Sequence, residues 1–216
     1  MNCAYCSMRC IRKGVRNGNQ NLQCTACGKY QRMAYRYQAC APGMGKQIAA
    51  HVREGCGIRS IARLLRISPT TVMVRILRMA ARLGPGAIPT GRNYEMDELS
   101  TYVGNKENRI WLAYAMDRQS KRIVALRVGA RSKRNLLPLF NALLQAGARS
   151  IRTDGVVFYK SLVPAAVHRV KRAGTNGIER MNLTLRTHLK RLARRTICYS
   201  KSVAMLRACA TIYCWG

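Results

Sequence analysis

The chain has 216 residues, of which 48% are apolar, 39 are Lys or Arg and only 8 are Asp or Glu, for a formal net charge of +31. The apolar share is enough for folded cores, which excludes a disordered basic tail. So large a positive surplus favours a polyanionic partner, with nucleic acid the strongest candidate and an anionic membrane surface a weaker one. No apolar run approaches the ~18 residues of a membrane span, and the N-terminus has no signal region, so we expect a cytoplasmic protein without membrane segments.

The first predicted element is a metal-binding module over residues 1–42. The stretches "CAYC" and "CTAC" each hold two cysteines separated by two residues, which is the spacing of two tight turns that present four thiolates to zinc. The predicted zinc ligands are Cys3, Cys6, Cys24 and Cys27. Disulfides and a redox pair are the alternatives, and the spare thiol Cys10 is a possible substitute ligand. So short a module buries little surface, and we expect the metal to supply its folding free energy in a zinc-ribbon-like fold.

Residues 43–83 predict three helices separated by "GCG" and "RIS". Ser68 followed by Pro69 is typical of a helix start, with a side-chain cap before a proline at the first helical position. Beyond it, an apolar stripe runs beside a polar one at helical spacing. The apolar stripe is Val72, Ile76, Met79 and Leu83, and the polar stripe is Thr71, Arg75, Arg78 and Arg82. We interpret the segment as a helix-turn-helix whose polar stripe contacts DNA, the alternative being an amphipathic helix with a solvated basic face.

A linker at residues 84–93, rich in glycine and proline, separates this half from a second half with a different pattern. Three strands are expected first, then a helix over 132–147 that is capped by Ser132 and ended by Gly147, a short strand over 150–155, and the longest helix from Thr175 onward. The three strands cover 94–103, 109–117 and 122–129. This order predicts an α+β domain over residues 94–216 built on a mixed sheet.

The second half has few acidic residues, and two of them lie at the ends of predicted elements. Only Asp154 and Glu179 follow Asp117 in the remaining sequence: the first closes a predicted strand, and the second lies in the first turn of the long helix. Asp97 lies in the first strand, on the face opposite Glu98. Carboxylates that converge in a basic protein suit Mg²⁺ or Mn²⁺, and two such ions can activate and stabilise the oxygens of a phosphodiester. Separately, each acid also has a structural reading, as a helix-terminal charge or a turn former.

The long helix carries an apolar stripe that must pack on the sheet, formed by Ile178, Met181, Leu185, Leu189 and Leu192. Along its flank, an acid is followed by an amide and two cations at helical spacing. These residues are Glu179, Asn182, Arg186 and Lys190. We therefore expect the acid at the rim of the core, with Asn182 and the cations placed to hold DNA phosphates.

At these residues the chain resembles a known family. The segments "YEMDEL", "TYVGNKENRIWLAYAMDR", "TDG" and "GTNGIERMNLTLRTHLKRLARRTICYSKS" are similar to transposases of the insertion-sequence-one family over roughly residues 93–206, and the N-terminal half is similar more loosely. The resemblance implies a ribonuclease-H-like core with a catalytic triad at Asp97, Asp154 and Glu179 and a basic residue at Arg186. The chain departs from the family pattern at Ser100, in place of a usual tryptophan, and by a slightly early end, so a decayed, inactive copy stays open as an alternative.

The resemblance also implies a reaction and partners. In the implied Mg²⁺-dependent reaction, hydrolysis at the element's end frees a 3′ hydroxyl, which then attacks target DNA. The expected partners are the double-stranded terminal repeats of the element, the target DNA and further copies of the chain on DNA, near the nucleoid of a prokaryote. Two other hypotheses remain open: a non-catalytic zinc and helix-turn-helix regulator, and a basic RNA-binding protein, which leaves the acids unexplained.

Overall fold

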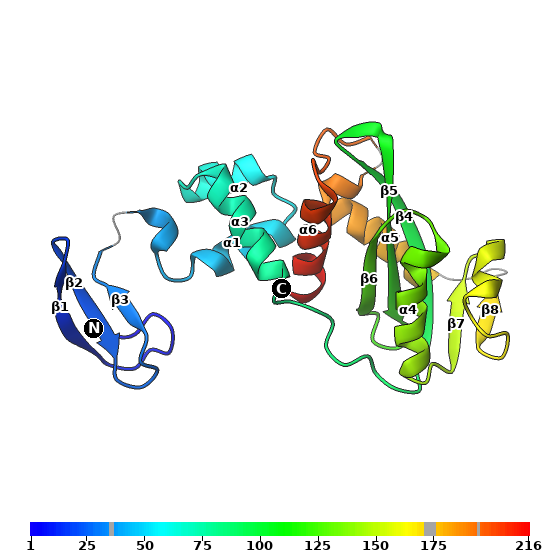
Figure 1. Cartoon of the computed structure of the whole chain (residues 1–216), viewed down its shortest axis with the longest axis horizontal. Coiled ribbons are helices and arrows are strands. Elements are labelled where there is room, and N and C mark those ends of the chain that lie inside the picture. The colour runs from blue at the N-terminus through cyan, green and yellow to red at the C-terminus, as the bar shows by residue number, and fades with distance from the viewer. Residues whose placement is uncertain (35–36, 171–175, 194) are drawn as a thin grey trace.

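The computed structural model describes residues 1–34, 37–170, 176–193 and 195–216, which form three successive parts (Figure 1). The first is an antiparallel sheet in the order β1 (Cys10–Arg16), β2 (Asn19–Cys24) and β3 (Tyr30–Arg32). Asn17 and Gly18 join β1 to β2 with positive φ angles of 52° and 75°, as a tight Asn-Gly hairpin turn requires. The buried centre of this module is small: Cys3, Cys10, Leu22 and Cys24.

The second part is a three-helix segment, α1 (Met44–Arg53), α2 (Ile58–Leu65) and α3 (Pro69–Ala80), preceded by a short 3-10 turn, η1 (Gln38–Cys40). The predicted start of α3 is confirmed, because the Ser68 side chain accepts a hydrogen bond from the Thr71 backbone N–H and Pro69 is the first helical residue. The predicted apolar stripe is also confirmed: Val72 and Ile76 are fully buried, and Met79 and Leu83 pack against the same cluster.

The third part contains a five-stranded sheet. Its strands are β4 (Asn93–Val103), β5 (Asn105–Asp117), β6 (Ile123–Gly129), β7 (Ser150–Thr153) and β8 (His168–Val170). They lie in the order β6-β5-β4-β7-β8. The β6–β5 and β5–β4 pairs are antiparallel, and the β4–β7 and β7–β8 pairs are parallel. The predicted α+β class with a mixed sheet is therefore confirmed, while β8 was not predicted.

Helices cover both faces of this sheet (Figure 1). On one face α4 (Lys133–Gln145) and the 3-10 turn η2 (Val157–Ser161) pack on residues such as Tyr94 and Met96. On the other face α5 (Asn176–His188) and the 3-10 turn η3 (Lys190–Leu192) pack on residues such as Leu99 and Tyr114. Ser132 caps α4 by accepting from the Asn135 N–H, as predicted.

The long helix differs from the prediction at both ends. The predicted start at Thr175 lies outside the described residues, and α5 is described from Asn176. The helix stops at His188, so Lys190 lies in the following 3-10 turn and not on a third turn of α5. The predicted apolar stripe nevertheless packs on the sheet, with Ile178, Leu185, Leu189 and Leu192 buried and Met181 partly buried.

A C-terminal helix, α6 (Val203–Trp215), was not predicted. It lies between the three-helix segment and the sheet (Figure 1). Its residues Met205, Ala208, Cys209 and Ile212 share a core with α1, α2 and α3. Leu206 and Ala210 share a different core with α5 and the sheet. The last helix of the chain therefore joins the second and third parts.

The α1–α2 turn also touches the third part. Gly55 has a φ of 71°, and a Cβ added there would lie 2.0 Å from the carbonyl oxygen of His188 at the end of α5. Only glycine allows this approach without movement of the backbone. Within the described residues, every helix is too short or too polar to cross a lipid bilayer.

Candidate functional site: a four-cysteine cluster and three carboxylates

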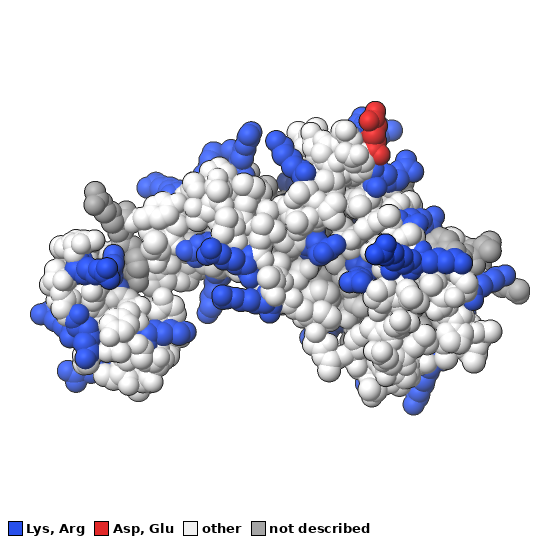
Figure 2. All heavy atoms as spheres, in the orientation of Figure 1, with Lys and Arg blue, Asp and Glu red and all other residues white. Residues whose placement is uncertain are grey.

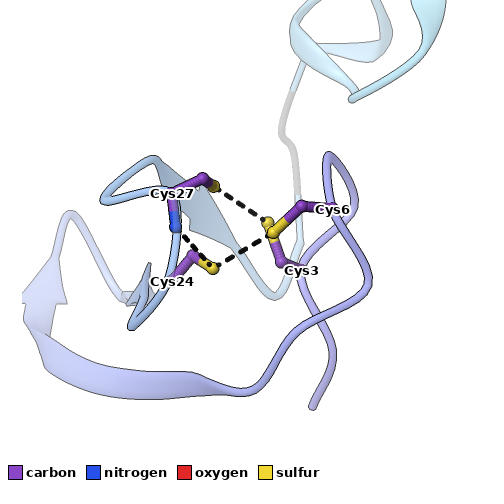
Figure 3. A group of neighbouring side chains, drawn as sticks. All are labelled: Cys3, Cys6, Cys24 and Cys27. Carbon is purple, nitrogen blue, oxygen red and sulfur yellow. Dashed lines mark hydrogen bonds between the residues drawn. The ribbon is translucent and has the colours of Figure 1, made fainter.

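Four cysteine side chains converge in the N-terminal module (Figure 3). Their sulfur atoms all lie within 4.8 Å of one another, with 3.7 Å between Cys3 and Cys27 and 3.4 Å between Cys6 and Cys24. Zinc bound tetrahedrally at about 2.3 Å per bond holds its sulfur ligands about 3.8 Å apart. The predicted ligand set thus has the spacing that this metal requires, and the cluster indicates a zinc site.

The turns that carry these cysteines are held by hydrogen bonds. The backbone N–H of Cys27 donates to the Cys24 sulfur at 3.4 Å, and this hydrogen bond is the main cause that lowers the pKa of the Cys24 thiol to about 6. Buried Gln31 accepts from the Ala4 N–H and donates to the Asn2 carbonyl, which ties the first turn to β3. Cys10 is buried beside Cys3 and Cys24 but lies outside the four-residue group.

Asp97 lies in β4 with its side chain toward α5. Its Oδ1 accepts from the Glu98 N–H at 2.7 Å, and its Oδ2 accepts from the Asn182 side-chain amide at 2.7 Å. A carboxylate oxygen has about two lone-pair sites, so each oxygen of Asp97 keeps one for a cation. The donor chemistry therefore fits a hard divalent ion.

Asp154 follows the parallel neighbour of β4. The parallel pairing ends with Tyr94 opposite Ile151 and Glu95 opposite Arg152, and Asp97 and Asp154 each follow two residues beyond the last pair. The Asp154 side chain is 48% exposed, and its Oδ2 lies 3.8 Å from Nη2 of Arg131.

Glu179 lies in the first turn of α5 and is exposed. Asn182, which contacts Asp97, follows one helical turn later, so the same helix brings Glu179 toward that aspartate. Arg186, half-buried, follows a further turn along the helix. Across the described residues only the cysteine cluster has three or more possible ligand atoms within 4.8 Å. The three carboxylates thus occupy neighbouring elements without forming a closed cluster.

A second set of contacts beside Asp154 was missed by the sequence reasoning. The Glu98 side chain is only 2% exposed, and its Oε2 accepts from both Arg131 Nε and the Tyr159 hydroxyl at 2.7 Å. The Arg131 guanidinium lies 4.6 Å from the ring centre of Trp111. A buried carboxylate, a tyrosine and an aromatic face thus hold the arginine that reaches Asp154. Glu98 is one of the few acids of the chain, and its place in an apolar strand was the available signal.

The predicted DNA-reading residues of α3 fall into two groups. Arg78 and Arg82 are exposed. Thr71 instead contacts the Tyr37 hydroxyl at 3.1 Å, and the half-buried Arg75 donates to the Ala39 carbonyl. The structure therefore turns Thr71 and Arg75 toward the segment that leads out of the cysteine module. Of the two other predicted contacts, Asn182 lies against Asp97 and Lys190 is exposed.

Positive charge is spread over all three parts of the molecule. On the face in Figure 2, Lys and Arg side chains cover every part and acidic side chains are nearly absent. Several of the 8 acids have partners within the protein: Glu95 pairs with Arg118 at 2.7 Å, Glu98 pairs with Arg131, Asp117 accepts from Ser120 and Asp97 accepts from Asn182. Little negative charge is left to oppose a polyanion at the surface.

Comparison with known proteins identifies the family. Residues 93–213, more than half of the chain, match the family model described as IS1 transposase. The insertion element IS1 4 protein InsB of Escherichia coli (strain K12) is 40% identical over 111 residues, which cover 51% of this chain and 66% of that protein. The insertion element IS1 protein InsB of Shigella flexneri is also 40% identical over 111 residues, covering 51% of this chain and 85% of that protein.

The chain thus spans slightly less than two thirds of the Escherichia coli relative. Among solved structures, a cryo-EM structure of the simian T-cell lymphotropic virus intasome in complex with PP2A regulatory subunit B56 gamma is 17% identical, with a TM-score of 0.39, and covers 76% of this chain and 65% of that chain. On the match over residues 93–213, the chain belongs to the IS1 transposase family.

Proposed function

We propose that the chain is a DNA transposase that binds the ends of its element, cuts a DNA strand there and joins the freed 3′ hydroxyl to target DNA. The observation that supports this proposal is that Asp97, Asp154 and Glu179 lie on neighbouring elements of a chain that belongs to the IS1 transposase family. β4, which carries Asp97, pairs in parallel with β7, after which Asp154 follows, and the Asn182–Asp97 hydrogen bond connects β4 to the helix that carries Glu179.

The proposed task of these three carboxylates is to hold Mg²⁺ or Mn²⁺. When bound, such ions supply activation of the attacking oxygen and stabilisation of the leaving one. The side chains around the carboxylates would orient them. The hydrogen bonds from Glu98 N–H and Asn182 hold the Asp97 side chain in one orientation, and Arg131 holds the side of Asp154 that faces it. Arg186, on the same helix as Glu179, is the proposed contact for a DNA phosphate near the reacting bond.

DNA binding is proposed for all three parts of the chain. We assign zinc to the cysteine module (1–42), duplex reading to a helix-turn-helix (43–83), and catalysis to the region 94–216, with 84–93 as the linker. The proposed contacts on α3 and η3 are Thr71, Arg75, Arg78, Arg82 and Lys190. The exposed Arg78 and Arg82 are best placed for direct contact, whereas Arg75 would act partly by holding the cysteine module against α3. For Asn182, the hydrogen bond to Asp97 favours a role beside the carboxylates over a phosphate contact.

The proposed partners are the double-stranded terminal repeats of the element, target DNA and further copies of the chain assembled on DNA. The place of action would be the nucleoid in the cytoplasm of a prokaryote.

A strand cleavage and joining assay tests the proposed function. Labelled duplexes carrying the flanking element ends are incubated with the purified chain and Mg²⁺, and the products are resolved as single strands. We expect a nick that leaves a 3′ hydroxyl at the element's end, followed by joined products, and loss of both with a chelator. A chain that binds the ends but neither cuts nor joins them with Mg²⁺ or Mn²⁺ would contradict the enzymatic function and favour the regulator.

A further inference from the structure

Tyr114 lies in the middle of β5, and its side chain is fully buried. Its hydroxyl lies 2.8 Å from Oδ1 of Asn182 and 3.2 Å from the backbone carbonyl of Ile178. A buried tyrosine hydroxyl needs a partner, and here both partners lie on α5. Ile178 immediately precedes Glu179 in the sequence. The Tyr114 hydroxyl therefore contacts α5 both next to Glu179 and at Asn182.

The Asn182 side chain connects Tyr114 to Asp97 through two hydrogen bonds. Its Nδ2 donates to Oδ2 of Asp97 at 2.7 Å, while its Oδ1 accepts from the tyrosine. The reverse orientation of the amide would put two oxygen acceptors 2.7 Å apart, which is repulsive, so the carboxylate selects the orientation and the tyrosine satisfies the other end. The three side chains form one directed chain of hydrogen bonds.

The tyrosine is a permanent donor in this chain. Burial, together with the negative charges of Asp97 and Glu95, raises the pKa of Tyr114 well above its ordinary value. The raised pKa favours the protonated hydroxyl, which is the form that can donate to Asn182.

We propose that Tyr114 is a positioning residue for the metal site, acting through Asn182 on Asp97 and holding α5 so that Glu179 faces the same place. The inference rests on the proposed function, because it gives Asp97 and Glu179 the role of metal ligands. Partners that orient ligands in this way commonly contribute 10- to 100-fold to metal affinity or activity.

Tyr114→Phe removes only the hydroxyl, and Tyr94→Phe is its matched control. Tyr94 is also fully buried, but its hydroxyl donates to the Pro89 carbonyl, away from the carboxylates. Mn²⁺ affinity is measured by calorimetry on the full, zinc-loaded chain without DNA, and cleavage and end binding are measured with DNA. We expect Tyr114→Phe to weaken Mn²⁺ binding and cleavage by about 10-fold or more, with end binding unchanged. Tyr94→Phe should change none of the three.

A second variant separates positioning from a general loss of packing. Asn182→Ala should weaken Mn²⁺ binding as Tyr114→Phe does, and adding Tyr114→Phe to it should cost nothing more, because the contact that connects the tyrosine to Asp97 is already gone. The inference would be overturned if Tyr114→Phe weakened Mn²⁺ binding equally in the parent and in Asn182→Ala. The inference would also be overturned if Tyr114→Phe bound Mn²⁺ and cleaved DNA within two-fold of the parent. In that case the proposed function would still stand. A parent chain that binds no Mn²⁺ and cleaves no DNA would overturn both.

Discussion

Replacing Gly55 by alanine tests whether the three-helix segment is docked against the sheet in solution. The added Cβ would lie 2.0 Å from the His188 carbonyl oxygen, whereas real Cβ atoms stay beyond 3.0 Å, so the two backbones must move apart by about 1 Å or more. In addition, alanine would be held at a φ of 71°.

The size of the effect can be bounded from the backbone alone. An L-residue in the left-handed region costs about 1–2 kcal/mol. For a chain of this size each kcal/mol lowers the melting temperature by about 2–4 °C, so we expect a fall of about 2–8 °C before any loss of the docked contact. Separation of the α1–α2 turn from α5 would increase the fall, because α6 packs on both parts.

Thermal unfolding and amide hydrogen exchange provide the assay, with Gly57→Ala as the matched control. Gly57 has an extended backbone with φ of −70°, and an added Cβ would meet only the Ser60 hydroxyl at 3.9 Å. Because Gly57 is the N-cap of α2, where alanine is less favourable than glycine, we expect both variants to lower the melting temperature, Gly55→Ala by more, and Gly55→Ala alone to speed exchange around His188. If both variants matched the parent in melting and in exchange, the contact between the α1–α2 turn and α5 would not exist in solution.

Two further predictions concern the DNA-binding half. Zinc analysis of the reduced chain should find about one ion per molecule. Changing both Cys24 and Cys27 to serine should abolish zinc binding and unfold the first module, while the five-stranded sheet keeps its protection from hydrogen exchange. A parent chain that contains no zinc but has a folded first module would contradict the zinc site. Arg78→Ala should weaken binding of the element's end by about 1–3 kcal/mol and of a random duplex by less if the arginine reads a base; equal losses on both duplexes would mean that it contacts only phosphate.

Local signals in the sequence predicted much of the fold. The Ser-Pro start of α3, the alternation along β4 and the cap of α4 each depend on a few neighbouring residues, and the structure confirms them. The four-cysteine cluster was predictable for the same reason, because two short turns fix the spacing of its members.

Elements whose pattern is set by distant partners were missed. The helix α6 is buried on two sides, between the three-helix segment and the sheet, and so is apolar nearly all round; such a helix has no amphipathic period. The strand β1 was missed for the opposite reason, since all but its first residue are exposed and no alternation marks it.

Distant contacts also decided the details of the candidate site. The sequence predicted the three carboxylates and placed Asn182 near Glu179 as a phosphate contact, but the contacts of Asp97 with Asn182 and of Glu98 with Arg131 join separate elements. Asn182 and Arg131 are ordinary polar residues by composition. Their roles follow from the pairing of β4 with its neighbours and from the packing of α5, which no local pattern encodes.

The most direct measurement of the central claim compares cleavage with binding in one variant, Glu179→Gln, on duplexes carrying the element's end. Glu107→Gln is the control, because Glu107 is exposed near the start of β5, whereas the buried contacts of Glu98 make it unsuitable. The account predicts that Glu179→Gln binds the end as tightly as the parent, or more tightly, since it removes negative charge near DNA, and loses Mg²⁺-dependent cleavage almost entirely. Cleavage by Glu179→Gln within a few-fold of the parent would contradict the claim that this carboxylate holds the catalytic metal.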